Sequence, residues 1–191
     1  MFFSIAISGV GENCPPMPPI MMPELMIILV QIRQGEKVEY EAELVAVIGK
    51  PARHVTEEQA LEYVLGYTCV NDVTAFQIIS EDPSFAQWSR AKSFDTFTPF
   101  GPVITTDLDT QSLQVTAQLN GEVRQDYPVS DMFFSPLELV QRISRGMTLL
   151  PGDIITCGTS LGAVPMEPGN TVDIRIYGIG TLSNTFGEGD G

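Results

Sequence analysis

Residues 38–49 read VEYEAELVAVIG, a stretch in which alternating acidic residues lead into a continuous apolar run. In an extended chain, residues two apart point to the same face of a sheet, so Glu39, Glu41 and Glu43 would share one face. Glu43 directly precedes the apolar run 44–48, where water is scarce. Because burying an ionised carboxylate without a partner costs several kcal/mol, the pattern predicts a strand whose carboxylates share a positive partner.

The balance of charge narrows the classes of partner. The chain of 191 residues has 24 acidic residues against 10 Lys and Arg, a formal net charge of −14 at pH 7. Such a surface repels nucleic-acid phosphates and anionic lipid headgroups, so we expect no nucleic acid and no membrane as partners. The uncharged runs are also too short to cross a bilayer. A small anionic substrate would meet the same repulsion unless a bound cation reversed the sign locally.

The cysteines Cys14, Cys69 and Cys157 are far apart and include no C-x-x-C pair. This spacing indicates neither a disulfide framework nor a thiolate zinc site, and we expect a reducing, cytoplasmic setting. The opening MFFSIAISGV contains no Lys or Arg, and the first cation of the chain is Arg33. The charge pattern of a secretory signal is therefore absent.

The length fits one domain with an irregular arm in front of it. Five of the fourteen prolines fall within the first 25 residues, so we expect residues 1–37 to form an N-terminal arm and 38–191 the domain proper. Residues 26–34 and 38–49 are each expected to be strands.

Two short helices are indicated by their capping residues. The first would begin after Thr56, with Gln59 completing a capping box, and end at Gly66. The second would begin after Ser135 and end at Gly146.

The remaining pattern is that of strands. Residues 67–75 read as a buried strand, and 81–102 as an ordered surface excursion rich in aromatic and turn residues. Alternating apolar residues from 113 to 119 lead into Asn120 and Gly121, a strong hairpin signal. We find no βαβ rhythm and no glycine-rich phosphate loop, so the fold class expected is mixed β (α+β) and a nucleotide-binding fold is disfavoured.

A third carboxylate joins the pair formed by Glu41 and Glu43. Asp72 is the only acid in the predicted strand 67–75, so it too is expected to be buried. Taken singly, each acid is better explained as a sheet-edge glutamate or a turn aspartate bonded to backbone N–H groups. Together they form a donor set for a hard divalent cation, because Mg²⁺ takes a few carboxylate oxygens and keeps several waters.

Four blocks carry a resemblance to a known family. In order, YEAELVAVIGKPAR, GYTCVNDVTA, WSRAKSFDTFTPFGP and LLPGDIITCGTSLG closely resemble the C-terminal catalytic domain of the fumarylacetoacetate hydrolase family, over residues 38–186. The resemblance implies a β-sandwich or roll with a few short helices around a Mg²⁺ or Mn²⁺ site, in a homodimer. It also implies a small 2-oxo or diketo acid as substrate.

The resemblance assigns a role to individual residues. The family's E-x-E pair falls on Glu41 and Glu43, and the aspartate of its N-D block falls on Asp72, which makes these three the implied metal ligands. The family's catalytic lysine falls on Lys92, for which the alternative is a surface lysine lying along Trp88.

The family's substrate-binding turn falls on Gly158 and Thr159. Its backbone N–H and hydroxyl would hold a substrate carboxylate, whereas the alternative is an ordinary turn after a strand.

The chain also departs from the family pattern. Phe76, Gln77 and Ile79 stand where members often have Arg, Asp and Gln, and the single histidine, His54, does not align with the family's catalytic histidine.

The sequence leaves three possible functions open. The first is C–C bond hydrolysis, decarboxylation or isomerisation through a metal-stabilised enolate, with hydrolysis the least supported because it needs a general base. The second is a metal-binding but catalytically impaired homologue with a structural or partner-binding role. The third is a β-rich scaffold that holds no metal.

Overall fold

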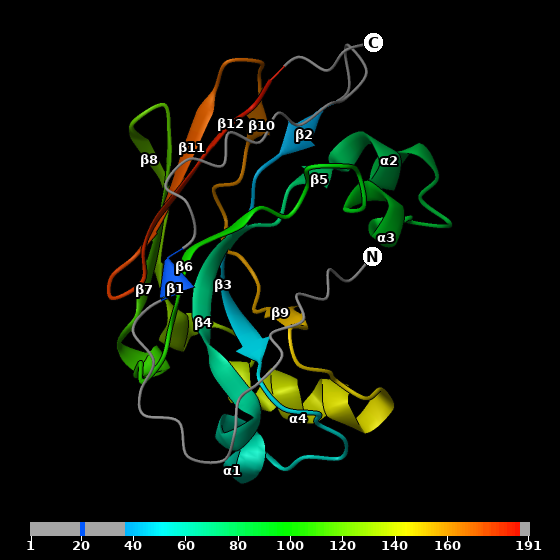
Figure 1. The fold of residues 1–191 in the computed structure, drawn as a ribbon. Coiled ribbons are helices and arrows are strands. Elements are labelled where there is room, and N and C mark those ends of the chain that lie inside the picture. The colour runs from blue at the N-terminus through cyan, green and yellow to red at the C-terminus, as the bar shows by residue number, and fades with distance from the viewer. Residues whose placement is uncertain (1–19, 22–36, 188–191) are drawn as a thin grey trace.

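Three antiparallel sheets dominate the computed structural model, which describes residues 20–21 and 37–187 (Figure 1). Their strand orders are β1-β6-β4-β3-β9, β12-β11-β7-β8 and β10-β2-β5. The helices are short, so the expected mixed β class with a few short helices is confirmed. No helix in the described part of the chain is long and apolar enough to cross a membrane.

The five-stranded sheet is built around β3 and β4, which pair along nearly their whole length. Edge strand β9 pairs with β3, and β6 pairs with β4. The strands are β1 (Ile20–Met21), β3 (Ala42–Ile48), β4 (Val64–Asn71), β6 (Phe100–Thr105) and β9 (Ile154–Thr156).

The four-stranded sheet consists of two hairpins. Its strands are β7 (Gln114–Leu119), β8 (Glu122–Pro128), β11 (Thr171–Ile176) and β12 (Gly180–Thr185). The turn between β7 and β8 is formed by Asn120 and Gly121, with φ of 52° and 82°, as the sequence predicts. Both angles are positive, which suits the turn types whose twist matches that of paired strands.

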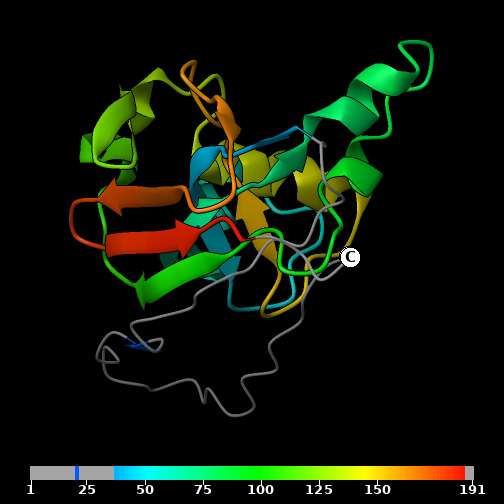
Figure 2. The ribbon, with the colours of Figure 1, turned by 90° about the horizontal axis from the view of Figure 1, so that it is seen from above.

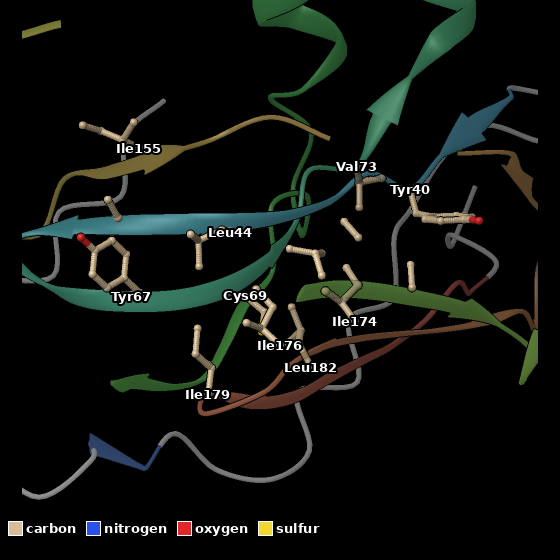
Figure 3. Packing of buried hydrophobic residues seen from close by; sticks show 14 of the residues in the cluster. Tyr40, Leu44, Tyr67, Cys69, Val73, Ile155, Ile174, Ile176, Ile179 and Leu182 are labelled. Atoms are coloured by element: carbon tan, nitrogen blue, oxygen red, sulfur yellow. The ribbon is translucent and has the colours of Figure 1, made fainter. Parts of the chain in front are cut away.

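The main core lies between these two sheets (Figure 3). Leu44 and Cys69 of β3 and β4 face Ile174, Ile176 and Leu182 of β11 and β12, and all five are buried. Burying each large aliphatic side chain stabilises the fold by about 1.5–3 kcal/mol. This packing fixes the orientation of β3, since its alternate residues must face the second sheet.

The opposite face of β3 and β4 carries a second, smaller apolar cluster. Val45, Val47 and Val70 are buried there, with Phe100 and Ile154 packed against them. Because side chains alternate along a strand, Glu43 lies on this same face, at the end of the apolar row. The local pattern of the sequence therefore places one carboxylate beside a dry surface.

The third sheet and two helices lie beyond the start of β3. The sheet contains β2 (Val38–Glu39), β5 (Thr74–Ala75) and β10 (Pro165–Met166). Helices α2 (Phe76–Glu81) and α3 (Trp88–Ala91) follow β5 and project from the sheets (Figure 2). α3 belongs to the segment 81–102, which was predicted as an ordered surface excursion.

Helix α4 (Pro136–Gly146) has the predicted bounds, with the Ser135 hydroxyl accepting a hydrogen bond from the Glu138 N–H. It packs near α1 (Glu57–Ala60), which is capped by Thr56 as predicted. Three short 3₁₀ turns complete the elements: η1 (Leu61–Tyr63), η2 (Thr110–Ser112) and η3 (Val129–Asp131).

Three predicted elements differ from those observed. The first helix ends with η1 at Tyr63 instead of Gly66, because Gly66 pairs with Val47 inside β4. The predicted strand 38–49 is interrupted at 40–41, and the predicted strand 67–75 begins at Val64 and is interrupted at 72–73.

Two further predictions fall where little of the chain is described. The predicted strand 26–34 lies outside the described residues. So does nearly all of the predicted arm 1–37.

Candidate metal centre and active site

The two interruptions in the strands lie next to each other and create the site. Between β2 and β3 the chain leaves the ladder at Glu41, and between β4 and β5 it leaves at Asp72. The Asp72 N–H donates to the Glu41 carbonyl at 2.8 Å, and the Glu41 N–H donates to the Asn71 side-chain oxygen at 3.2 Å. These bonds hold the two irregular segments side by side.

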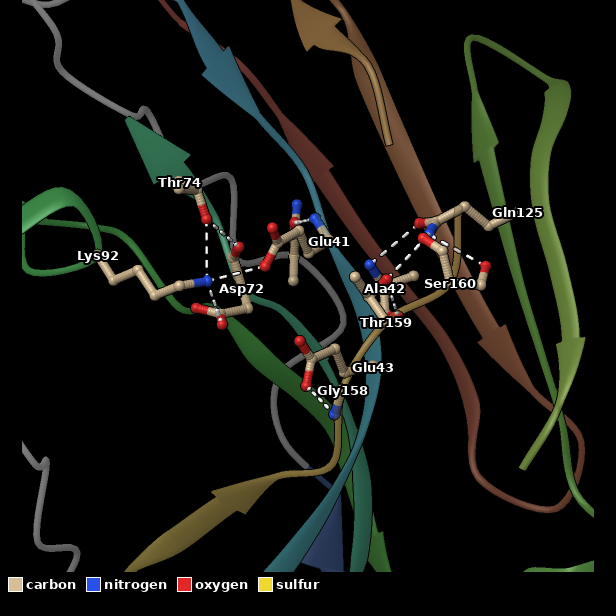
Figure 4. A network of polar contacts seen from close by, with 11 residues as sticks. Glu41, Ala42, Glu43, Asp72, Thr74, Lys92, Gln125, Gly158, Thr159 and Ser160 are labelled. Carbon is tan, nitrogen blue, oxygen red and sulfur yellow. Dashed lines mark hydrogen bonds and ion pairs between the residues drawn. The ribbon is translucent and has the colours of Figure 1, made fainter. Parts of the chain in front are cut away.

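Three carboxylates converge at this point (Figure 4). One oxygen each from Glu41, Glu43 and Asp72 can be chosen so that all three atoms lie within 4.8 Å of one another. The Glu43 residue is 4% exposed and Asp72 8% exposed. The structure thus brings together the three residues to which the sequence assigns metal binding.

Lys92 lies beside these carboxylates, at the end of α3. Its ammonium donates to Glu41 Oε2 at 2.8 Å, Asp72 Oδ2 at 2.5 Å and Thr74 Oγ1 at 2.9 Å. Burial alone lowers the pKa of the ammonium, but the hydrogen bonds to Asp72 and Glu41 outweigh it and hold the pKa above its usual value. Lys92 is therefore a fixed cation of the site, and the surface position along Trp88 is not the one observed.

Glu43 is the most deeply buried of the three acids. Burial, followed by the charge of Asp72, raises the pKa of its carboxyl to about 8, against a lowering by the hydrogen bond from the Gly158 N–H at 2.6 Å. A carboxyl in this position is stabilised by a proton or by a cation at close range. A cation bound beside Glu43 would be the positive partner that the strand pattern requires.

The loop after β9 is hydrogen-bonded to the first residues of β3, next to the carboxylates. The Gly158 N–H donates to Glu43, and the Thr159 hydroxyl donates to the Ala42 carbonyl at 2.9 Å. Both groups that could hold a substrate carboxylate therefore have partners within the chain. Gly158 has a φ of 103°, a conformation that L side chains rarely adopt, so a glycine suits this position.

Two residues of β8 that the sequence did not single out hold this loop in place. Buried Gln125 accepts from the Ala42 N–H at 3.2 Å and donates to the Thr159 hydroxyl at 2.9 Å and the Ser160 carbonyl at 2.8 Å. The Tyr127 hydroxyl donates to the Gly158 carbonyl of the loop at 3.1 Å and to the Ala42 carbonyl of β3 at 2.7 Å. In the sequence, Gln125 is one of several polar residues of a hairpin strand, and nothing in the local pattern marks it as buried.

A pocket of about 380 Å³ adjoins the carboxylates. Asp72 and Lys92 contribute to its lining, together with residues of the segment after α3, of β6 and of β9. His54, the single histidine, lies past the far end of β3, where its N–H donates to the Ser144 carbonyl. It is not among the residues that line the pocket.

The donor set fits a hard divalent cation. It consists of three carboxylates, and Mg²⁺ and Mn²⁺ both favour oxygen ligands. Cys157, which directly precedes Gly158 in the chain, has a thiol pKa raised to about 12 by burial and by the charge of Glu43. A neutral thiol of this kind is a poor ligand, so the chemistry of the site favours oxygen coordination.

Comparison with known proteins identifies the family of this chain. Residues 14–187 match the family model described as fumarylacetoacetate (FAA) hydrolase, C-terminal. The chain belongs to the fumarylacetoacetate hydrolase family. The resemblance carried by the four sequence blocks is therefore confirmed.

Relatives in the fumarylacetoacetate hydrolase family include named enzymes. Oxaloacetate tautomerase YisK of Bacillus subtilis (strain 168) is 42% identical over 161 residues, which cover 79% of this chain and 52% of that protein. The crystal structure of 5-carboxymethyl-2-hydroxymuconate delta-isomerase from Mycobacterium smegmatis is 42% identical with a TM-score of 0.82, covering 86% of this chain and 65% of that one.

A further solved relative was crystallised with ligands. Fumarylpyruvate hydrolase from Pseudomonas aeruginosa, in complex with Mn²⁺ and pyruvate, is 30% identical with a TM-score of 0.78, covering 85% of this chain and 71% of that one. The chain spans less than two thirds of the length of several curated relatives that it matches. The expected fumarylacetoacetate hydrolase fold is confirmed by these structures.

Proposed function

We propose that this chain is a divalent-metal-dependent enzyme that acts on a small 2-oxo or diketo acid. The observation that carries the proposal is the convergence of Glu41, Glu43 and Asp72 beside Lys92 and an adjoining pocket. Relatives named as a tautomerase, an isomerase and a hydrolase support it, as does the complex of one relative with Mn²⁺ and pyruvate.

Glu41, Glu43 and Asp72 would hold Mg²⁺ or Mn²⁺. When bound, the ion would supply Lewis-acid polarisation of a substrate carbonyl. Gly158 would keep the Glu43 carboxylate oriented through its N–H. The loop with Gly158 and Thr159 is also proposed to contact the substrate.

Lys92 is proposed as the catalytic residue. Its ammonium is hydrogen-bonded to Glu41 and Asp72, and Lys92 is one of the residues that line the pocket. There it would neutralise negative charge that develops on a substrate oxygen, with the Thr74 hydroxyl fixing its position. A preorganised charge of this kind costs no rearrangement during the reaction.

Isomerisation and decarboxylation are better supported than hydrolysis. Both require charge stabilisation and proton delivery, whereas hydrolysis also requires an activated water. General-base assistance is worth about 10²- to 10⁴-fold, and the single histidine of the chain lies past the far end of β3. The same observation favours a second candidate, a metal-binding homologue with impaired catalysis and a structural or partner-binding role.

Turnover measurements distinguish these candidates. Oxaloacetate, acylpyruvates and fumarylacetoacetate would be incubated with the chelated protein, with and without millimolar Mg²⁺ or Mn²⁺. The proposal expects metal-dependent conversion that is lost in Asp72→Asn and kept in Glu39→Gln, because Glu39 lies outside the carboxylate group. Metal binding without conversion of any substrate would favour the impaired homologue, and neither binding nor conversion would overturn both. The homodimer and the cytoplasmic location stay predictions.

A further inference from the structure

The residues that line the pocket beside Lys92 indicate which kind of substrate can bind there. Its volume of about 380 Å³ falls within the range of small-molecule sites. The apolar part of its lining is formed by Phe94, Phe97, Phe100 and Ile154. Phe100 and Ile154 also pack against the buried valine cluster of β3 and β4, so this side of the pocket is backed by the core.

The charges around the pocket are mostly negative. Among the described residues that line it, Lys92 is the only cation, and it is already hydrogen-bonded to two carboxylates. Asp95 adds a further negative charge to the lining and takes part in none of the ion pairs between described residues. The hydroxyl groups of the lining are uncharged, and that of Ser93 donates to the Ser89 carbonyl. Among the described residues of the lining, a second anionic group would find no cation without carboxylate partners.

We propose that this pocket binds the distal end of the substrate and selects an uncharged, apolar tail over one that ends in a second carboxylate. The inference rests on the proposed function, because the 2-oxo acid head is assigned to the carboxylates and Lys92. Phe94, Phe100 and Ile154 remove the tail from water, while Asp95 repels a terminal carboxylate. Like charges placed together without compensation are a common means of excluding wrong ligands.

Binding of unreactive 2-oxo acid mimics tests this inference without a turnover assay. Oxamate supplies the head alone, N-pentyloxamate adds an apolar tail, and N-(4-carboxybutyl)oxamate replaces the terminal methyl by a carboxylate. Calorimetric titration in the presence of Mg²⁺ should show N-pentyloxamate binding about tenfold tighter than oxamate, the scale of apolar contacts in such pockets. N-(4-carboxybutyl)oxamate should bind no tighter than oxamate.

Reversing the charge of one residue in the pocket lining provides a second test of the inference. Asp95→Lys should tighten binding of N-(4-carboxybutyl)oxamate by about tenfold and change that of oxamate less than about twofold. Glu62→Lys is the matched control, since Glu62 is exposed on η1, lies outside the lining and gives the same change in net charge. It should leave all three dissociation constants unchanged.

The outcomes separate this inference from the proposed function. If oxamate binds but the carboxylate tail binds as well as the pentyl tail, or Asp95→Lys behaves like Glu62→Lys, the inference is overturned and the head site stands. If none of the three ligands binds to the Mg²⁺-loaded protein, the proposed function fails and the inference fails with it.

Discussion

The backbone N–H of Gly158 donates a hydrogen bond of 2.6 Å to the carboxylate of Glu43, which lies 115 positions earlier in the chain. The bond joins the loop after β9 to the buried face of β3. Glu43 thereby receives one backbone donor, whereas Lys92 donates to the other two acids. Glu43 thus has a different partner from Glu41 and Asp72, so its role can be tested separately.

Divalent metal should stabilise the native protein. A ligand that binds only the folded state at 100 times its dissociation constant raises the free energy of unfolding by about 2.7 kcal/mol. We expect millimolar Mg²⁺ to raise the melting temperature of chelated protein, measured by differential scanning calorimetry. Glu43→Gln should abolish the increase and Glu39→Gln should keep it. An identical melting temperature with and without Mg²⁺ in the unmodified chain would count against the site.

Replacing the ammonium of Lys92 should impair catalysis more than metal binding. Lys92→Met keeps most of the stem and removes the charge, so kcat/KM for any accepted 2-oxo acid should fall by about 10²-fold or more, the scale of one lost charge contact in the transition state. Mg²⁺ affinity, measured by calorimetry, should not weaken, because a neighbouring cation has been removed. Lys50→Met, at an exposed position, is the control. Unchanged kcat/KM in Lys92→Met would exclude Lys92 as a catalytic residue.

Gln125 should be intolerant of an isosteric change. Gln125→Glu keeps the shape but removes the two N–H donors, and it places an acceptor against the Ser160 carbonyl. Leaving such buried groups unpaired costs about 1–3 kcal/mol, more when one is charged. Urea unfolding should therefore show a loss of at least about 2 kcal/mol. Gln111→Glu, at an exposed position in η2, should change stability little. Equal stability of the two variants would contradict the role of the amide.

Buried thiols should make the protein less stable in alkali. Burial raises the pKa of Cys69 to about 12, compared with 9.0 for an unperturbed thiol. Above about pH 9 the unfolded chain releases this proton and the native protein does not, so the free energy of unfolding should fall as pH rises from 9 towards 12. In urea unfolding at pH 8 and pH 10.5, Cys69→Ala should lose less stability between the two values than the unmodified chain. An equal loss in both proteins would show that Cys69 does not contribute.

The parts of the fold that the sequence predicts well are those specified by neighbouring residues. Ser135 and Pro136 define the start of α4 within one turn, and Asn120 and Gly121 define the turn of their hairpin. The convergence of the acids was also predictable, because a buried carboxylate such as Glu43 requires a partner wherever it occurs. The helix start and the hairpin turn are each specified by a few neighbouring residues, and the convergence of the acids follows from their burial.

The parts that were missed depend on contacts distant in sequence. Gly66 follows a capped helical turn and resembles a helix stop, yet a Cβ there would lie 2.6 Å from the Thr105 carbonyl, so close packing of β4 on β6 explains the glycine. Gln125 acquires its role from Ala42, Thr159 and Ser160, which no local pattern connects to it. Which segments meet is decided by pairing of whole strands.

The hairpin turn at Asn120 and Gly121 divides the chain in a way that matters for protein engineering. All three carboxylates and Lys92 precede it, whereas Gln125, Gly158 and Thr159 follow it. A break at this turn would therefore give one piece that contains every acid of the site and another that contains the residues supporting them. Recovery of metal binding on mixing would then act as a reporter of correct reassembly, because the acids of the first piece depend on Gly158 and Thr159 of the second for their positions.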